Sequence, residues 1–226
     1  MATFFEKLIV EKLIVEKLIV EKLSFEMLSF EMLSVEKLSI KKIGLLLSCA
    51  LLASCLGRPE GVTPVEQLDT QRYLGTWYEV ARLDHSFERG LSNVTADYSM
   101  REDGGLRVIN RGYSAEKDDW QRAEGRAYTI KEDQPGHLKV SFFGPFFGSY
   151  VVFELDSDYQ HAFVAGNTTG YLWLLARTPT VSDQLREHFL QRAEALGFAV
   201  DDLIFVDQGL NASAVGTDVA PPLSSD

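Results

Sequence analysis

The sequence feature that most constrains the fold is a succession of short segments, beginning after Thr70, in which apolar and polar residues alternate. Alternation with a period of two is typical of strands that bury one face. Turn residues separate the segments, as in "REDGGL" (101–106), where the glycines tolerate the positive φ angles of tight hairpins. We expect strands at 76–84, 93–100, 106–114, 121–130, 137–143, 148–155, 160–166 and 171–177.

Strands of this number, joined by short loops, favour an up-and-down antiparallel barrel, because closure removes the exposed edges of a sheet. A barrel of eight strands has room for side chains or one small ligand, not for a channel. A single α-helix is expected next, with Thr180 as its N-cap and Gly197 at its C-terminal end. Its apolar face comprises Leu185, Phe189, Ala193 and Leu196. "DLIFV" (202–206) is a candidate ninth strand, so the predicted fold class is all-β with one C-terminal helix.

The charge of the chain excludes some classes of partner. The formal net charge is −11, and residues 1–54 hold as many Lys as Glu, so the acidity lies after Cys55. Nucleic-acid binding needs clustered Lys and Arg, and so does adhesion to anionic lipid by charge alone. We therefore expect neither.

Residues 6–40 repeat a five-residue unit that begins as EKLIV. Five residues advance an α-helix by roughly 500°, so the apolar positions precess instead of forming one face. In a strand, an odd period turns each copy to the opposite side. We interpret residues 1–38 as a translated tandem repeat upstream of the true start, with a variable leader and a genuine extension as alternatives.

After the repeat, the sequence has the order of a secretion signal. Lys41 and Lys42 precede a short apolar run that ends in Leu-Ala-Ser-Cys (52–55). This tetrad resembles a bacterial lipobox, in which the cysteine is acylated and becomes the new N-terminus. We expect a signal peptide at 39–54 and lipid attachment at Cys55, against the alternative of a buried structural cysteine. The other expected parts are a lipidated tether (55–69), the barrel with its helix (70–208) and a disordered tail (209–226).

Three short motifs resemble those of the lipocalin family. Gly75-x-Trp77 matches the first family signature, and Asp158-Tyr159 matches the second, although Ser157 stands where threonine is usual. Arg177, at the end of "YLWLLAR", matches the third. The resemblance covers about residues 65–208 and implies that these five matched residues close one end of the barrel, with Arg177 over the Trp77 ring as a cation–π contact.

Within this family, "ARLDHSFERG" and "LKVSFFGPFFGSYVV" are similar to the bacterial outer-membrane lipocalins. This resemblance implies a protein held to the outer membrane by lipid on Cys55, with its barrel facing the periplasm. It also implies a fatty acid or lysophospholipid as ligand, stored or transported during envelope maintenance and stress. A homodimer is compatible with the resemblance.

Strand parity and the resemblance together suggest which side chains line the interior. Parity places Glu79 and Ala81 inside with Trp77, although an inward Glu79 would need a partner. The resemblance points Tyr98 inward, and by parity Ala96 and Val94 follow. The candidate pocket residues are Tyr98, Tyr113, Phe142, Tyr171 and Trp173, each of which could equally be plain barrel packing.

Sequence motifs for catalysis or metal binding are not found. His85, His137, His161 and His188 lack ligand spacing and are interpreted as surface or loop residues. A nucleophile elbow and a phosphate-binding glycine loop are also absent from the sequence. We therefore predict a binding protein with no metal or cofactor. The alternatives are an enzyme of this fold that acts on a lipophilic substrate and an envelope scaffold whose barrel is filled.

Overall fold

The computed structural model describes residues 56–211. Cys55, the expected signal peptide and the pentapeptide repeat lie outside this range, as does the chain after residue 211. The first helix, α3 (Thr70–Tyr73), is a single turn, and the Asp69 carboxylate caps it by accepting from the backbone N–H of Gln71 at 2.9 Å. The helix leads directly into the first strand.

The eight predicted strands are present, within two residues of their predicted bounds. They are β1 (Gly75–Leu83), β2 (Leu91–Met100), β3 (Leu106–Ser114), β4 (Asp119–Thr129), β5 (His137–Phe143), β6 (Phe146–Leu155), β7 (His161–Ala165) and β8 (Leu172–Ala176). Helix α4 (Asp183–Ala195), the short 3₁₀ helix η1 (Val200–Asp202) and strand β9 (Leu203–Phe205) follow.

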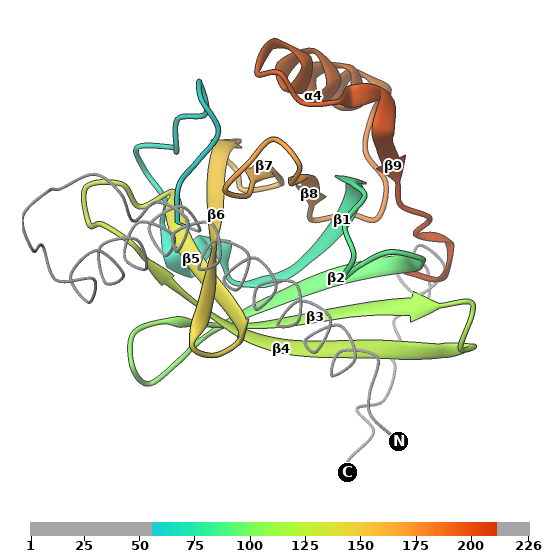
Figure 1. The fold of residues 1–226 in the computed structure, drawn as a ribbon, viewed down its shortest axis with the longest axis horizontal. Helices are drawn as coiled ribbons and strands as arrows, with labels where there is room; N and C mark the ends of the chain where they lie inside the picture. Colours follow the sequence, from blue (N-terminus) through green and yellow to red (C-terminus); the bar gives the residue numbers. More distant parts are fainter. Residues whose placement is uncertain (1–55, 212–226) are drawn as a thin grey trace, which may run out of the picture. The chain divides into compact units, whose positions relative to one another are not determined.

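The sheet closes on itself as an antiparallel barrel (Figure 1). Each strand pairs with its neighbour in sequence from β2 to β8, and β1 pairs with both β8 and β2. The Gly75–Tyr78 end of β1 pairs with β2, whereas its far end, Ala81–Leu83, pairs with β9. The predicted eight-stranded barrel and ninth strand are therefore confirmed.

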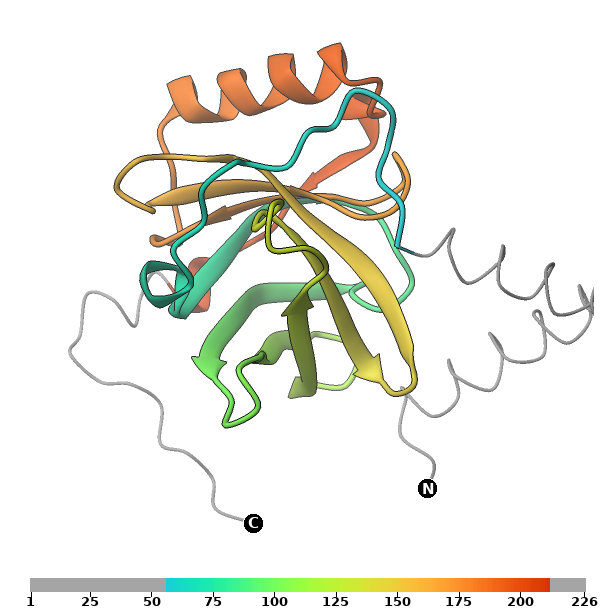
Figure 2. The ribbon, with the colours of Figure 1, turned by 90° about the vertical axis from the view of Figure 1, so that its left-hand side faces the viewer.

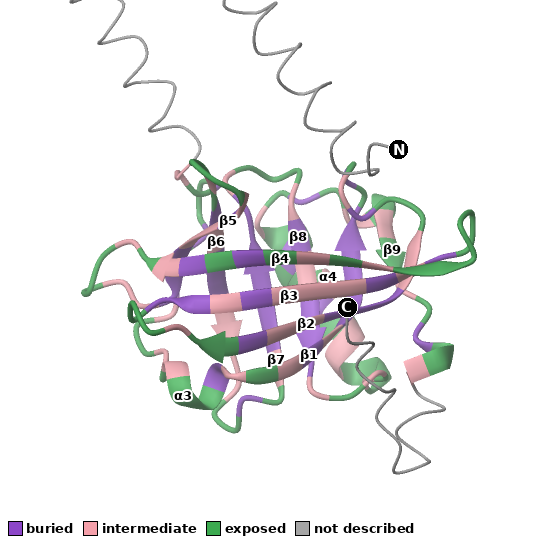
Figure 3. Ribbon diagram, turned by 90° about the horizontal axis from the view of Figure 1, so that it is seen from below, coloured by how far each residue is buried: buried purple, intermediate pink, exposed green. Residues whose placement is uncertain are grey.

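Two apolar clusters stabilise the molecule. One fills the barrel interior and includes Trp77, Val108 and Val152. The other lies between the outer face of the barrel and α4, where Phe189 and Ala193 pack with Phe163. Figure 2 shows α4 lying across the outside of the barrel, and Figure 3 shows buried stretches along β1 and β8, the strands with two covered faces. Burial on both faces explains why these strands are richer in apolar residues than β4.

The helix begins two residues later than its predicted cap. Ser182, not Thr180, is the N-cap, and its hydroxyl accepts from the Leu185 N–H at 3.2 Å. The Thr178 hydroxyl donates to the Thr180 carbonyl, so this stretch forms a turn instead of helix. At the other end, Gly197 adopts a φ of 79° and its N–H donates to the Glu194 carbonyl, while that of Phe198 donates to Ala193. This is a Schellman motif, as the glycine predicted.

The segment expected to be a lipidated tether packs against the barrel at Val62 and Val65. Val62 is only 2% exposed and belongs to the cluster under α4. Further along, the Val65 N–H donates to the Val152 carbonyl at 2.9 Å. The expected tail also begins too early, because Leu210 N–H donates to the Asn93 side-chain carbonyl at 2.8 Å and the Asn211 amide donates to the Asn93 backbone carbonyl. Along residues 56–211, no helix is both long enough and apolar enough to cross a bilayer.

Candidate functional site

The closed end of the barrel is built around Trp77, which is fully buried. Its indole N–H donates to the Tyr73 carbonyl at 2.8 Å, and the Arg177 guanidinium carbon lies 3.9 Å from the ring centroid. Arg177 also donates to the carbonyls of Thr76 and Arg72 at 2.8 Å. Gly75 adopts a φ of 88°, a conformation that favours glycine. The expected cation–π contact is therefore present.

The second signature acts mainly through its backbone and its tyrosine. Tyr159 has a φ of 59°, its phenol oxygen accepts from the Asp69 N–H at 2.8 Å, and its carbonyl accepts from Arg177. Asp158 is exposed and contributes its carbonyl to Gln160. The carboxylate that shapes this turn is Asp156, which accepts from the N–H groups of residues 160 and 161. Sequence reasoning missed Asp156, although an acidic residue at the start of a turn is a usual signal.

A chain of phenols crosses the interior next to Trp77. Tyr98, one of the predicted pocket residues, donates to the Tyr150 hydroxyl at 2.9 Å, and Tyr150 lies 2.8 Å from the hydroxyl of Tyr73. Burial raises the pKa of all three phenols above the ordinary value. They therefore stay neutral, and each buried hydroxyl is paired.

A β-bulge changes the predicted parity of β1. The register with β8 shifts between Glu79 and Ala81, so that Arg82, not Ala81, pairs opposite Trp173. Ala81 consequently packs in the outer cluster, and the prediction that it lines the interior is wrong. Arg82 enters the barrel instead and is 1% exposed.

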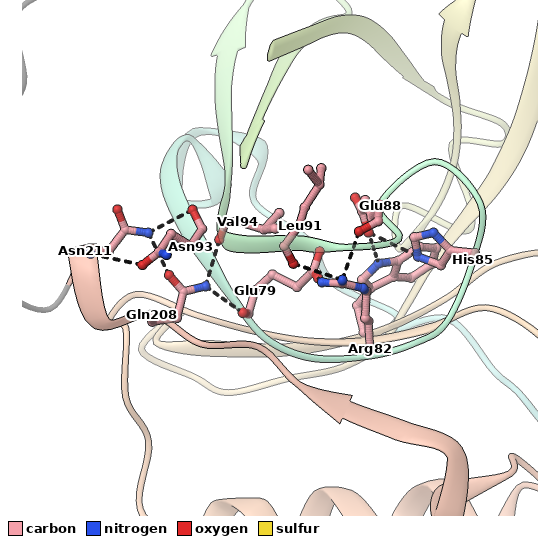
Figure 4. A network of polar contacts seen from close by, with 10 residues as sticks. Glu79, Arg82, His85, Glu88, Leu91, Asn93, Val94, Gln208 and Asn211 are labelled. Atoms are coloured by element: carbon pink, nitrogen blue, oxygen red, sulfur yellow. Dashed lines mark hydrogen bonds and ion pairs between the residues drawn. The ribbon is translucent and has the colours of Figure 1, made fainter. Parts of the chain in front are cut away.

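Arg82 is the partner that an inward Glu79 requires (Figure 4). Its guanidinium lies 2.6 Å from the Glu79 carboxylate and donates to the carbonyls of Glu88 and Leu91. Because these two carbonyls flank the end of the β1–β2 loop, Arg82 fixes that loop to the strand. Gln208 donates to the carbonyls of Glu79 and Val94, which holds the segment after β9 against the same region.

The two buried carboxylates of this network shift their pKa values in opposite directions. Burial, followed by the nearby Glu88 charge, raises the pKa of Glu79 well above its usual range, despite Arg82. Burial would also raise the pKa of Glu88, but the hydrogen bond and charge of His85 outweigh it and lower the value, helped by Trp173. Within the pair, Glu79 therefore holds a proton more tightly than Glu88 does.

The β1–β2 loop covers two of the predicted pocket residues at the open end. His85 stacks on Phe87 with ring centroids 3.9 Å apart and lies 5.1 Å from the Trp173 ring. The Trp173 indole donates to the Glu88 carboxylate at 3.1 Å, and Tyr171 stacks against Trp173 at 6.1 Å. Tyr171 and Trp173 contact each other, as expected, but the rings of His85 and Phe87 from the β1–β2 loop lie against them.

The remaining two candidate pocket residues, Phe142 and Tyr113, lie on opposite faces of the barrel wall. Phe142 belongs to the interior cluster and packs against Gly125, where an added Cβ would lie 2.8 Å from its ring. Tyr113 lies on the outer surface, because the register pairs Val108 and Asn110, its even-numbered neighbours on β3, with inward positions of β2. Its ring packs against Trp120 and its hydroxyl donates to Asp118. The prediction of Tyr113 as a pocket residue is therefore wrong.

Small side chains occupy the inward positions of the strands opposite the loop. Ala96, Asn110 and Ala123 lie side by side across β2, β3 and β4, in the same row as Trp77. The side-chain oxygen of Asn110 is buried and accepts no hydrogen bond from the described residues. A row of small side chains that includes the free Asn110 acceptor suits a ligand that carries a hydroxyl.

The histidines are not all surface residues. His85 and His137 are buried, and His137 lies 2.6 Å from the Ser149 hydroxyl. Burial lowers the pKa of His137, and the positive charges of Arg58 and Lys131 add to the effect. His161 and His188 each contact one carboxylate, Asp156 and Glu154. Among residues 56–211, no group of three or more His, Cys, Asp and Glu side chains could hold a metal ion.

Comparison with known proteins gives consistent matches. The lipocalin-like domain family matches residues 68–208. The outer membrane lipoprotein Blc of Vibrio cholerae is 56% identical over 165 residues, covering 73% of this chain and 96% of that protein. The Blc protein of Escherichia coli K12 is 54% identical over 66% of this chain and 85% of its own length. The crystal structure of the cockroach allergen Per a 4 has a TM-score of 0.54 at 21% identity, covering 69% of this chain and 98% of that one.

Proposed function

This chain belongs to the lipocalin family and, like its bacterial relatives, is an outer-membrane lipoprotein; from this premise we propose that its barrel binds a fatty acid or a lysophospholipid. Storage or transport of that lipid during envelope maintenance and stress is the proposed role.

The row of small inward side chains carries the proposal. Ala96 and Ala123 flank Asn110 on one wall, and Phe142, on the adjacent strand β5, packs over Gly125 beside them. Aromatic and aliphatic surfaces of this kind suit an acyl chain, and the free Asn110 oxygen can accept from the hydroxyl of a glycerol backbone. An aromatic or branched residue at these positions would instead fill the space with protein.

The proposed anchor is lipid on Cys55, with the barrel on the periplasmic side. Since Pro59 is already buried and Val62 is docked, only residues 56–58 separate Cys55 from the buried part of the segment. Three residues span at most roughly 10 Å. The barrel would thus remain near the membrane surface, where lipids are available to it. Two or more acyl chains are needed for stable attachment of this kind.

The buried polar cluster is better explained by structure than by catalysis. Relatives in this family are generally binding proteins, not enzymes. Glu79, Arg82 and Glu88 are all engaged with one another or with loop carbonyls. His85 is stacked between Phe87 and Trp173, so it has no open approach for a substrate.

Native mass spectrometry of the chain from Leu56 onward tests the proposal, because both apolar clusters and every strand lie after that residue. Palmitate and palmitoyl lysophospholipids are the probes. We expect one ligand to be retained per chain. The same spectra show whether the protein is a monomer or the homodimer compatible with the family resemblance.

Ala123→Phe is the blocking variant, and Ala115→Phe, in the exposed β3–β4 turn, is its matched control. Thermal denaturation checks that both variants fold. Loss of ligand from Ala123→Phe alone supports an interior site. Retention of no lipid by the unaltered chain would overturn the proposed function.

A further inference from the structure

The barrel wall opens on one side, between β4 and β5. The ladder between these strands runs only from Arg126 opposite Ser141 to Thr129 opposite Leu138. The first half of β4, from Asp119 to Gly125, continues with β3 alone, and the two form a long ribbon in Figure 1. Backbone pairing therefore does not close the wall beside Phe142.

A cleft of about 180 Å³ lies where the two strands separate. Arg101, Arg126, Ser141, Phe142 and Gly144 are among its lining residues. The cleft thus joins charged groups on the outer surface to a ring that belongs to the interior cluster.

The strongest indication of a ligand is Ser141. Its side chain is 4% exposed, it lines the cleft, and its hydroxyl has no hydrogen-bond partner among the described residues. A buried hydroxyl without a partner costs roughly 1–3 kcal/mol, so a ligand that hydrogen-bonds it would gain from its presence. Such a group is an exception that calls for an explanation.

The guanidinium beside Ser141 is also available. Arg126 forms no ion pair within residues 56–211, and its guanidinium carbon lies 5.6 Å from the centroid of the Phe147 ring. It packs directly on Gly144, where an added Cβ would lie 2.8 Å from a guanidinium nitrogen. Glycine at 144 therefore lets the charged group lie flat against the β5–β6 turn.

The other charged side chains at the cleft form ion pairs that leave a net positive charge there. The Glu124 carboxylate is held by Arg107 at 2.7 Å and by Arg122 at 2.8 Å. Arg101 is paired with Asp103 at 3.0 Å. In a protein with a formal net charge of −11, this surplus of arginines at one opening favours an anion.

We propose that the cleft between β4 and β5 binds a phosphate group through Arg126 and Ser141. Resting on the proposed function, the phosphate is the head group of a lysophospholipid whose chain passes Phe142 into the barrel; free phosphate offers the same chemistry. Phe142 fills the space over Gly125, so rotation of one ring is enough to admit a chain. The loop over Tyr171 and Trp173 leaves this side as the less obstructed entrance.

The test compares two amphiphiles with the same acyl chain, palmitoyl lysophosphatidylglycerol and uncharged monopalmitoylglycerol, on the chain from Leu56 onward. Arg126→Gln combined with Ser141→Ala removes the proposed phosphate ligands. Arg111→Gln, which alters an outward arginine of β3 away from the cleft, is the matched control. Inorganic phosphate alone, followed by NMR at the Ser141 amide, is the third probe.

We expect the double variant to weaken lysophosphatidylglycerol binding by about tenfold, the value of one lost charged hydrogen bond, and to leave monopalmitoylglycerol unchanged. Perturbation of the residue-141 amide by inorganic phosphate that is seen with serine and not with alanine in the double variant would support the site with free phosphate as its source. Equal effects on both amphiphiles, with no response to phosphate, would overturn it. If the unaltered chain binds neither amphiphile, the proposed function fails, and the phosphate titration still decides the cleft.

Discussion

The guanidinium carbon of Arg177 lies 3.9 Å from the centroid of the Trp77 ring, and the two side chains together seal one end of the barrel. Arg177 directly follows β8, and Trp77 lies on β1. The contact therefore also joins the two strands that close the sheet. The Trp77 indole and the Arg177 guanidinium donate hydrogen bonds to backbone carbonyls of α3 and of β1, the strand that follows it. Their shared role is therefore structural.

Arg177→Ala should lower stability far more than ligand affinity. The variant loses the cation–π contact and three hydrogen bonds to carbonyls, of Arg72, Thr76 and Tyr159. We expect a loss of about 3 kcal/mol in the free energy of unfolding. Urea denaturation and lipid titration of the same sample measure the two effects. Arg177→Lys keeps the charge but cannot reach all three carbonyls, so an intermediate loss is expected. Reduced affinity at unchanged stability would refute the structural role.

Arg82 should matter more than the carboxylate it contacts. Arg82→Met leaves Glu79 and Glu88 buried without their shared cation and frees two loop carbonyls. The Arg82 charge helps to lower the pKa of the buried Glu88, so its removal should cost about 3–5 kcal/mol, as when one partner of a buried ion pair is lost. Glu79→Gln keeps the shape of a side chain that already favours the protonated form, so it should cost less than about 1 kcal/mol. Urea denaturation compares the variants, and equal costs would contradict the assignment of the proton to Glu79.

The two buried carboxylates should give opposite pH dependences. A raised folded pKa means that Glu79 stabilises the fold fully below its unfolded value of 4.5 and loses that contribution as the pH rises through the folded value. Glu88, with a lowered pKa, stabilises the fold above 4.5 and loses that contribution as the pH falls. Relative to the unaltered protein, Glu79→Gln should therefore gain stability as the pH rises above 4.5, whereas Glu88→Gln should gain stability as the pH falls below 4.5. Parallel stability curves for the two variants would contradict this prediction.

Sequence periodicity predicted the strands well because each has at least one buried face. Periodicity could not predict which face of the barrel wall a side chain points to where the backbone departs from regular alternation. The bulge between Glu79 and Ala81 moves Arg82 inside, and no residue type at this point signals it. The aromatic character of Tyr113 suits a pocket, but the register of β3 with β2 places this residue on the outer surface.

Contacts between residues far apart in the chain could not be predicted from the sequence either. Residues 84–90 have the composition of a polar loop, yet His85 and Glu88 are buried, because Trp173, 85 residues further along the chain, donates to Glu88. Residues 56–69 have the Pro and Gly content of a linker, but Val62 finds an apolar site between the barrel and α4. Composition alone does not reveal such a site.

Val62→Asp should release the segment that leads to the proposed anchor. Val62 packs in the cluster with Phe189, and a charge there would be buried without a partner. We expect a loss of about 2–4 kcal/mol and faster cleavage after Glu60 by a glutamate-specific protease, because the docked segment becomes accessible. Glu66→Ala, an exposed change in the same segment, is the control and should affect neither measurement. An unchanged cleavage rate in Val62→Asp would show that Val65, through its hydrogen bond to Val152, is enough to hold the segment against the barrel.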